Sequence, residues 1–316
     1  MRTPIHFSTS EIRAARGDKN VVNPREPYAY LVEEELSASG RVEAVATLFL
    51  TNRECPFTCL FCDLWKNTTD ETIPPGAVLE QIDFALGKLP PARHIKLYNS
   101  GNFFDPKAIP AEDLSEIARR VNSFRTVIVE NHPRFCNDAC LHFRDELRGQ
   151  LEIAIGLETI HPEILPALNK RMTVEDFDHA AEMLAIGGIA LRAFVLLRPP
   201  FLEEEEGVEW ALKTVEHAFD QGARVCSVIP VRGGNGVMDL LARGREFSPP
   251  KLDSMERVLA AGISLDRGRV FVDLWDAEKF ATCGRCAGVR IARLLQMNLR
   301  QQVLPKIACE CGGSAA

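Results

Sequence analysis

Three cysteines in one short segment carry the strongest chemical signal in this chain. Cys55, Cys59 and Cys62 follow the spacing C-x3-C-x2-C, so their thiolates can lie on one loop and bind one metal centre. A [4Fe–4S] cluster is held by cysteine thiolates, usually four, and a chain that supplies three leaves one iron open to another ligand. A zinc knuckle is the alternative, but structural zinc takes four nitrogen or sulfur ligands, and the next histidine is His94.

The same segment, with Phe61 before its last cysteine, resembles the signature of the radical S-adenosylmethionine (radical SAM) superfamily. The resemblance implies that the open iron chelates the amino and carboxylate groups of S-adenosylmethionine (SAM), and that Phe61 belongs to the SAM site. It also implies that one electron splits the sulfonium C–S bond and forms a 5′-deoxyadenosyl radical. Such an enzyme needs an electron donor such as flavodoxin or ferredoxin.

A second group of cysteines lies near the C-terminus. Cys283, Cys286, Cys309 and Cys311 form the pattern C-x2-C…C-x-C, with an insert of helix length between the two pairs. A closed set of four thiolates is the usual pattern of structural zinc, which would attach the tail to the preceding domain. The same four thiolates could hold an auxiliary [4Fe–4S] cluster. The sequence favours zinc and leaves the cluster open as an alternative.

Polar residues follow the predicted strands, at the ends where a parallel barrel gathers its reactive groups. Glu158 ends the fourth predicted strand and can accept hydrogen bonds from a ribose diol. Arg171 can pair with a carboxylate as a bidentate donor. The resemblance implies that the loop after the second strand exposes its backbone to the methionine amino group of SAM. That loop is Asn99, Ser100, Gly101 and Asn102, which departs from the common Gly-Gly-Glu form.

The elements that must position these residues alternate between strands and helices. Apolar runs predict strands at residues 45–50, 94–98, 126–130, 151–157, 190–197 and 224–230. Helical segments between them indicate parallel β/α units with right-handed crossovers. Six units fall short of the eight in a closed barrel. The pattern therefore predicts an α/β fold, a partial (β/α)6 TIM-like barrel, and the radical SAM superfamily is similar in this respect.

Three regions are expected along the chain. The partial barrel should occupy residues 43–265. Residues 1–42 are polar and predict an N-terminal extension, with a helix at Tyr30–Ser37 packed outside the core. Residues 266–316 contain the second cysteine group and predict a C-terminal four-cysteine metal-binding region.

Several segments narrow the resemblance within the superfamily. They look like the branch that contains the elongator catalytic subunit, and most like the radical SAM subunit of archaeosine synthase. This resemblance implies a reaction on a modified tRNA base. The segments that resemble the elongator branch are Gly156–Thr159, Leu168–Thr173, Gly188–Ile189 and Phe194–Phe201. Those that resemble the archaeosine synthase subunit are Asn99–Pro106 and Leu196–Leu202.

Composition limits the other possibilities. The net charge of −7 argues against a generally basic nucleic-acid surface. A small biosynthetic metabolite is therefore an alternative substrate to the modified tRNA base. No run of about 18 apolar residues predicts a membrane span, and no apolar signal core begins the chain, which favours a cytoplasmic protein. Ten cysteines in a reducing compartment indicate metal binding or catalysis. A non-catalytic iron–sulfur or zinc-binding sensor or scaffold remains the alternative function.

Overall fold

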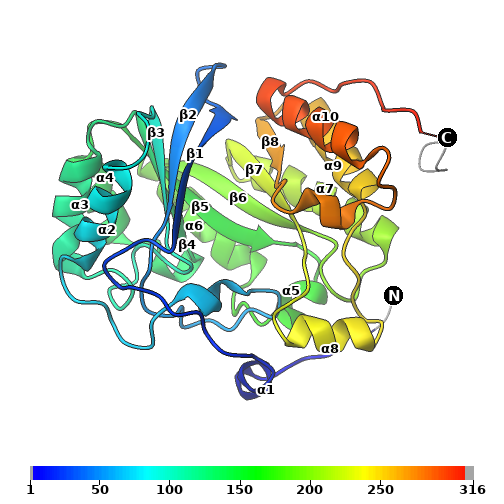
Figure 1. Ribbon diagram of the computed structural model, residues 1–316, viewed down its shortest axis with the longest axis horizontal. Coiled ribbons are helices and arrows are strands. Elements are labelled where there is room, and N and C mark those ends of the chain that lie inside the picture. The colour runs from blue at the N-terminus through cyan, green and yellow to red at the C-terminus, as the bar shows by residue number, and fades with distance from the viewer. Residues whose placement is uncertain (1–2, 310–316) are drawn as a thin grey trace.

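The centre of the structure, a computed structural model that describes residues 3–309, is one curled sheet of eight strands (Figure 1). Its strands are ordered β1 to β8 as in the chain. β1 (Ala29–Leu36) pairs antiparallel with β2 (Val42–Phe49), and every later neighbouring pair is parallel. The other strands are β3 (His94–Tyr98), β4 (Thr126–Asn131), β5 (Gln150–Glu158), β6 (Ala190–Leu197), β7 (Val225–Pro230) and β8 (Arg269–Val272).

The predicted α/β partial barrel is confirmed, and its six predicted strands correspond to β2–β7. The helix predicted at Tyr30–Ser37 is wrong, because this segment is β1. Its register with β2 runs from Ala29 opposite Phe49 to Leu36 opposite Val42. The pairing with β2 outweighs the local helical propensity of the glutamates in this segment.

The sheet extends beyond the predicted barrel on both sides. β1 lies within the predicted N-terminal extension, and β8 lies within the predicted C-terminal region. Both strands contribute to the same sheet as the predicted barrel strands. The division of the chain at residues 43 and 266 stays a prediction.

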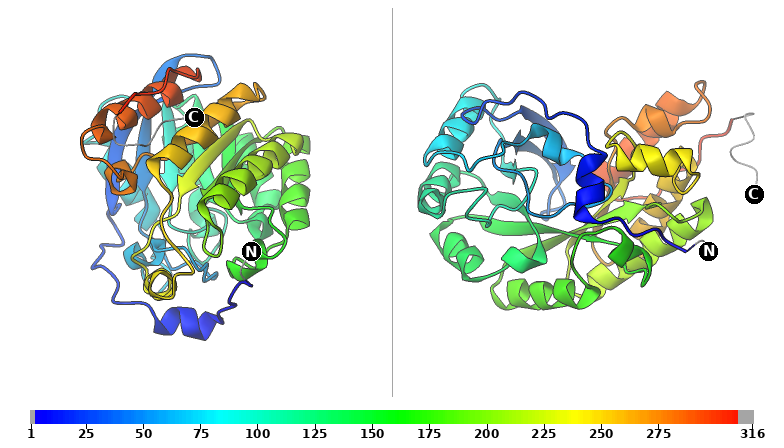
Figure 2. Two further views of the ribbon diagram at one scale, coloured as in Figure 1. Left: turned by 90° about the vertical axis from the view of Figure 1, so that its right-hand side faces the viewer. Right: turned by 90° about the horizontal axis from the view of Figure 1, so that it is seen from below.

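Within residues 3–309, seven helices lie around the sheet; Figure 2 shows their arrangement. They are α2 (Ala77–Leu86), α3 (Leu114–Val121), α4 (Asp138–Glu146), α6 (Val174–Ile186), α7 (Glu204–Asp220), α9 (Leu252–Ser264) and α10 (Ala287–Arg300). Three shorter helices lie at the lower end in Figure 1, where the parallel strands finish: α1 (Thr9–Ala14), α5 (Ile164–Ala167) and α8 (Val237–Arg243). The 3-10 turns are η1 (Leu64–Asn67), η2 (Ala111–Asp113), η3 (Pro133–Phe135) and η4 (Ala277–Phe280).

Local sequence accounts for several helix boundaries. α6 begins after Thr173, because the Thr173 hydroxyl accepts from the Asp176 backbone N–H while the Asp176 carboxylate accepts from the Thr173 N–H. Its C-cap residue is Gly187. No helix within residues 3–309 is long and apolar enough to cross a membrane.

Ion pairs fill the barrel interior near the start of the parallel strands. Glu35 accepts from Lys96 Nζ at 2.7 Å and from Arg192 Nη2 at 2.6 Å, and Arg192 Nε donates to Glu152 at 2.6 Å. Burial alone would raise the pKa of Glu35, but Arg192 and Lys96 hold it well below its usual range. The interior at this end is therefore occupied by side chains, and the opposite end remains for a functional site.

Helix α10 packs against both edge strands, β1 and β8. Its Asn298 amide exchanges two hydrogen bonds with the backbone of Val272, at 2.9 and 3.0 Å. Gln301 does the same with Val270, at 2.7 Å in both directions. These side-chain amides satisfy the edge of β8 in place of a further strand.

Candidate functional site

The cysteine loop follows β2 and lies at the end of the barrel where the parallel strands finish. Burial raises the pKa of the Cys55, Cys59 and Cys62 thiols, to about 12 for Cys62. Repulsion from the neighbouring thiolates adds to the raised pKa of Cys59 and Cys62, so the three sulfur atoms lie near one another. Because burial favours the protonated thiols, a metal must displace their protons when it binds.

Two asparagines from distant loops fix the shape of the cysteine loop. Asn169, after β5, donates to the backbone oxygen of Thr58 at 2.9 Å and to its hydroxyl at 2.8 Å. Asn235, after β7, donates to the backbone oxygens of Leu60 at 2.8 Å and Cys62 at 3.1 Å. Their contacts tie the loop, which follows β2, to two other β/α units. Neither asparagine was predicted from the sequence as part of the site.

The predicted SAM loop, residues 99–102, lies beside the cysteines. Asn102 Nδ2 lies 3.3 Å from the sulfur of Cys55, within hydrogen-bond range for sulfur. The Glu130 carboxylate, on β4, accepts from the backbone N–H groups of Asn99 at 2.7 Å and Gly101 at 3.4 Å. Ser100 adopts a φ of 52° and exchanges a hydroxyl hydrogen bond of 2.8 Å with Tyr28. The loop is therefore held in one conformation by its neighbours.

Three buried asparagines at this end carry side-chain atoms without a hydrogen-bond partner within residues 3–309. Asn52 follows β2, Asn99 follows β3 and Asn131 ends β4, and each is at most 4% exposed. The unpaired atoms are Asn52 Oδ1, Asn131 Oδ1 and both polar atoms of the Asn99 side chain. An unpaired buried polar group costs about 1–3 kcal/mol. The arrangement therefore fits a polar ligand such as SAM, which carries both donors and acceptors.

Glu158 and Lys170 form a buried ion pair next to the cysteines. Burial opposes the charge of Lys170, but Glu158 and the thiolates of Cys59 and Cys55 outweigh it and raise the pKa of the lysine. Glu158 has a φ of 65°, and a side chain at Gly156 would collide with both charged groups. The role of Glu158 in binding ribose stays a prediction.

Arg171 lies outside this cluster and contacts the N-terminal segment instead. Its Nη2 donates to the Thr9 hydroxyl at 2.8 Å, and Thr9 in turn lies 3.0 Å from the hydroxyl of Thr58 in the cysteine loop. Arg16, just after α1, donates to Glu54 at 2.7 Å. The role of Arg171 in SAM binding stays a prediction. The cations that act electrostatically on the cysteines are Lys170, on Cys55 and Cys59, and Arg16, on Cys62.

Helix α1 covers part of this end of the barrel, next to α8, as the right-hand view of Figure 2 shows. Buried Ile12 joins one apolar cluster with Leu60 of the cysteine loop and with Val237 and Met238 of α8. Phe61 packs against the same cluster. The predicted contact between Phe61 and SAM stays a prediction.

His132, directly after β4, is a structural residue in this fold. Its ring stacks on Phe57 with centroids 3.9 Å apart, Nδ1 accepts from the Arg134 N–H at 3.2 Å, and Nε2 lies 3.1 Å from the Lys170 carbonyl oxygen. Burial, together with the positive charge of Lys170, lowers its pKa to about 3. The ring is neutral at physiological pH and braces the loop that carries Lys170.

The second cysteine group is also brought together. The ligand atoms of Cys283, Cys286 and Cys309 all lie within 4.8 Å of one another. Cys311, the predicted fourth ligand, lies outside the described residues. These cysteines stand on the α10 side of the fold, apart from the cysteine loop after β2.

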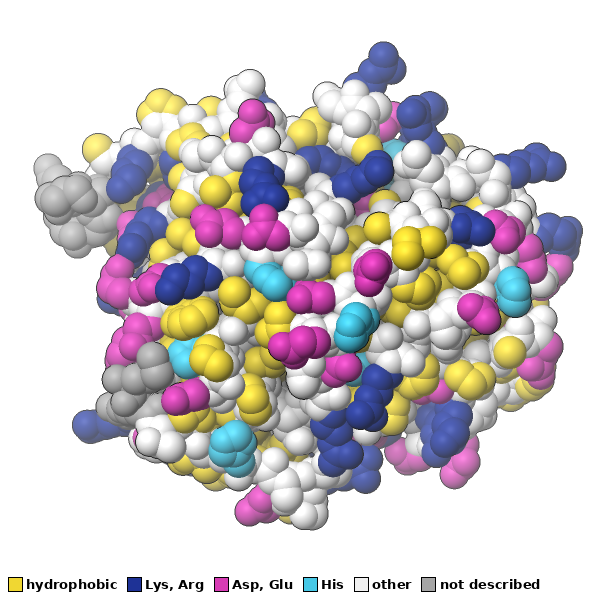
Figure 3. Space-filling view, turned by 180° about the vertical axis from the view of Figure 1, so that it is seen from behind, with side chains coloured by type: hydrophobic (Ala, Val, Ile, Leu, Met, Phe, Trp, Pro, Cys, Tyr) yellow, Lys and Arg dark blue, Asp and Glu magenta, His cyan; other side chains and the backbone are white. Residues whose placement is uncertain are grey.

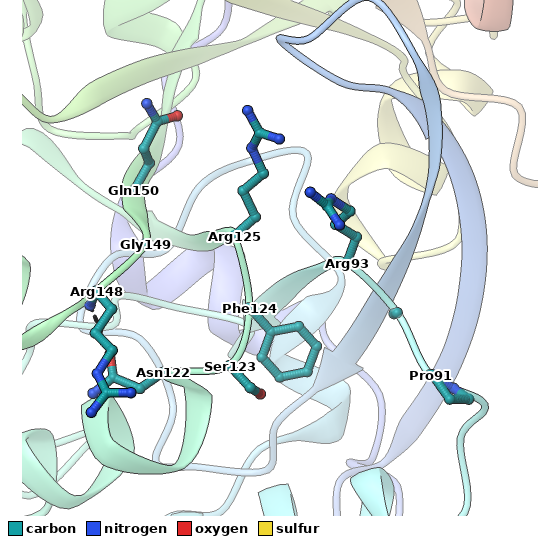
Figure 4. Close-up of a pocket in the computed structure, with 10 residues that line it drawn as sticks. Pro91, Arg93, Asn122, Ser123, Phe124, Arg125, Arg148, Gly149 and Gln150 are labelled. Carbon is teal, nitrogen blue, oxygen red and sulfur yellow. Dashed lines mark hydrogen bonds between the residues drawn. The ribbon is translucent and has the colours of Figure 1, made fainter.

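A pocket of about 590 Å³ lies at the opposite end of the barrel, where β3, β4 and β5 begin (Figure 4). Arg93, Arg125 and Arg148 line it, and none of the predicted site residues does. Arg93 is paired with Glu43 at 3.0 Å. This pocket is therefore separate from the cysteine loop.

The fold is similar to that of a solved enzyme. No protein-family model matches the chain. The crystal structure of methylornithine synthase superposes with a TM-score of 0.51, covering 70% of this chain and 64% of that chain at 13% sequence identity. This likeness shows the shared partial-barrel fold.

Curated proteins of similar sequence match half of the chain or more. The chain is 23% identical to an uncharacterised Methanocaldococcus jannaschii protein, over 93% of this chain and 87% of the relative. It is 26% identical to archaeosine synthase subunit beta of Methanosarcina acetivorans over 64% of this chain, and 26% identical to that of Thermococcus kodakarensis over 52%. These sequence likenesses and the shared fold agree with the resemblance of the cysteine segment to the radical SAM superfamily. The matched region spans 60% and 53% of the two archaeosine synthase subunits.

Proposed function

We propose that this chain is a radical SAM enzyme whose [4Fe–4S] cluster is held by Cys55, Cys59 and Cys62. The observation that carries the proposal is the combination of three half-buried thiols, which interact electrostatically with one another, and unpaired asparagine atoms at the same barrel end. Three protein thiolates leave one iron for SAM. When bound, the cluster supplies the electron that splits the sulfonium bond of SAM and so produces a 5′-deoxyadenosyl radical.

The chain's own residues bind and orient SAM in this proposal. Backbone and side-chain groups of residues 99–102 bind its methionine end, and Glu130 fixes that loop through two backbone N–H groups. Glu158 accepts from the ribose hydroxyls through the oxygen that Lys170 does not engage. Lys170 offsets negative charge beside the cysteines. An electron donor of the flavodoxin or ferredoxin class supplies the electron.

The proposed substrate is a modified base of tRNA. Support comes from the two relatives named archaeosine synthase subunit beta. A small metabolite is the second candidate, favoured by the net charge of −7 and by the N-terminal segment packed over the cysteine loop. Acidic and basic side chains are interspersed on the face in Figure 3, so that face offers no continuous basic surface to RNA.

The class of reaction can be tested without knowing the substrate. Protein purified and reconstituted without oxygen should bind about four irons and should form 5′-deoxyadenosine from SAM and dithionite. Replacing Cys55, Cys59 and Cys62 with alanine should abolish both. Arg125→Glu is the control, because this exposed residue lines the opposite pocket. A stable cluster that never cleaves SAM would support the sensor or scaffold alternative instead.

A second experiment separates the two substrates. Filter retention of tRNA at low and moderate salt reports binding, and 5′-deoxyadenosine formation reports turnover. A tRNA substrate should be retained at moderate salt and should increase 5′-deoxyadenosine formation. Stimulation by a small-molecule extract depleted of RNA, with no tRNA retention, would contradict the tRNA proposal.

A further inference from the structure

The cysteine group at α10 differs in geometry from the cysteine loop after β2. Within residues 3–309, Cys283, Cys286 and Cys309 are the cysteines whose sulfur atoms all lie within 4.8 Å of one another. The three cysteines after β2 are near enough to interact electrostatically but do not form such a compact group. The fold therefore contains two cysteine sites with different sulfur separations.

We infer that Cys283, Cys286 and Cys309 bind one zinc ion that attaches the C-terminal tail to helix α10. Zinc binds thiolates at about 2.3 Å in a tetrahedron, which places sulfur atoms about 3.8 Å apart. In a [4Fe–4S] cluster each thiolate binds a different iron, so its sulfur atoms are spread more widely. The compact separation therefore fits a single ion and argues against an auxiliary cluster at this position.

Positive charge lies beside Cys286. Cys286 is the N-cap residue of α10, where the helix dipole presents partial positive charge. The Arg290 guanidinium, one turn further on, interacts with Cys286 and donates to Glu256 at 2.7 Å. Thiolates are soft ligands that select zinc over magnesium or calcium. A site with three or four thiolates carries excess negative charge, which Arg290 and the helix end offset.

The tail that carries Cys309 also contacts α10 at a position other than the proposed zinc site. Arg293, buried on α10, donates from Nε to the backbone oxygen of Pro305 at 2.7 Å and to that of Leu304 at 3.2 Å. An ion at Cys309 would fix the same tail to the first residues of the helix. Because α10 packs against β1 and β8, the ion would stabilise the helix that spans the two edges of the sheet.

Metal analysis of the full-length protein, purified without oxygen, tests this site. We expect about one zinc per chain, as one tetrahedral ion requires. Cys283→Ser and Cys309→Ser should each reduce the zinc content at least tenfold and leave the iron content unchanged. Cys226→Ser, a buried cysteine on β7, is the matched control and should change neither metal. Wild-type zinc content in both variants, or loss of iron in place of zinc, would overturn the inference.

Cobalt substitution of the wild-type protein gives a second readout that does not depend on how the variants fold. Cobalt bound at this site should show thiolate charge-transfer bands and the strong visible bands of tetrahedral coordination. Cobalt that binds without these bands would contradict a thiolate site. The outcome is independent of the proposed SAM chemistry: zinc lost from the variants of a protein that contains no iron would support this inference and refute the proposed function.

The fourth position is tested in the same way. Cys311, two residues after Cys309, is the predicted ligand from sequence, and Cys311→Ser should lower the affinity for zinc. Competition with a chelator measures that change.

Discussion

Asparagine side chains make the most informative contacts at the level of single residues. Asn235 donates to two carbonyl oxygens of the cysteine loop and accepts from the Met238 N–H at 2.8 Å. It is 5% exposed, so water does not replace these bonds. Asn235 therefore holds the shape of the cysteine loop, which is the proposed metal-binding loop.

Asn235→Ala should loosen the cysteine loop. Leaving buried carbonyl groups unpaired should cost about 1–3 kcal/mol of folding free energy, and the iron content after reconstitution should fall. Iron analysis and the half-life of the cluster in air measure the effect.

Asn122→Ala is the matched control for that variant. Asn122 also bridges two backbone groups, donating to Glu146 at 3.2 Å and accepting from Arg148 at 2.8 Å, but it lies at the opposite end of the barrel. It should lower the melting temperature and leave the iron content unchanged. An equal loss of iron in both variants would show that Asn235 acts only through overall stability.

Lys170 is the residue whose charge bears most directly on the cysteine site. Lys170→Met should destabilise the protein by about 3–5 kcal/mol, because Glu158 would remain buried without its partner. It should also lower the reduction potential of the cluster, since a positive charge beside the thiolates favours the more negative, reduced state. Unfolding curves and a redox titration followed by electron paramagnetic resonance measure the two effects.

The double variant Lys170→Met/Glu158→Gln separates stability from redox tuning. Removing both charges should recover part of the lost stability, because a buried ion pair is often replaceable by neutral groups. A potential that returns fully to the wild-type value in this variant would contradict a direct electrostatic role of Lys170.

At the level of helices and strands, α10 stabilises the sheet by covering the edge of β8. Asn298→Ala and Gln301→Ala each remove two hydrogen bonds to that edge. Each should cost about 1–3 kcal/mol, and the double variant should associate through the exposed edge. Thermal unfolding and size-exclusion chromatography report these changes. Arg300→Ala, at an exposed position on the same helix, should have neither effect.

Strand β1 determines how the barrel closes at the end opposite the site. It directs Glu35 into the interior, where the carboxylate meets Lys96 and Arg192. Lys96 lies on β3 and Arg192 lies on β6. The ion pairs of Glu35 therefore connect β1 to two strands that are distant from it in sequence. Removal of β1 from the sheet would take both carboxylate partners, Glu33 and Glu35, from the buried Lys96, and would leave Arg192 with Glu152 on β5.

Across the described residues, the ion pairs of Glu35 occupy one end of the barrel, and asparagine atoms without a partner gather at the other. The ion pairs predict how stability depends on pH. The folded-state pKa of Glu35 lies below its ordinary value of 4.5, so the stability it contributes is present above pH 4.5 and is lost as pH falls further.

Glu35→Gln should therefore lower the free energy of unfolding at pH 7 by about 3–5 kcal/mol. It should also lose less stability than the wild-type protein when the pH is lowered below 4.5. Urea unfolding at pH 7 and pH 4 measures both quantities. A variant with the same acid sensitivity as the wild type would contradict the assignment of this pH dependence to Glu35.

The sequence by itself determined the cysteine loop, the six strands β2–β7 and the cap of α6. These features depend on spacing, on continuous apolar runs and on local capping groups, all of which act over short stretches of chain. Only the tertiary structure decided that residues 29–36 form a strand, and that Asn169, Asn235 and Lys170 meet at the cysteines. The physical reason is that their partners lie far away in sequence: an edge strand and a buried polar side chain each take their stability from groups that folding brings beside them.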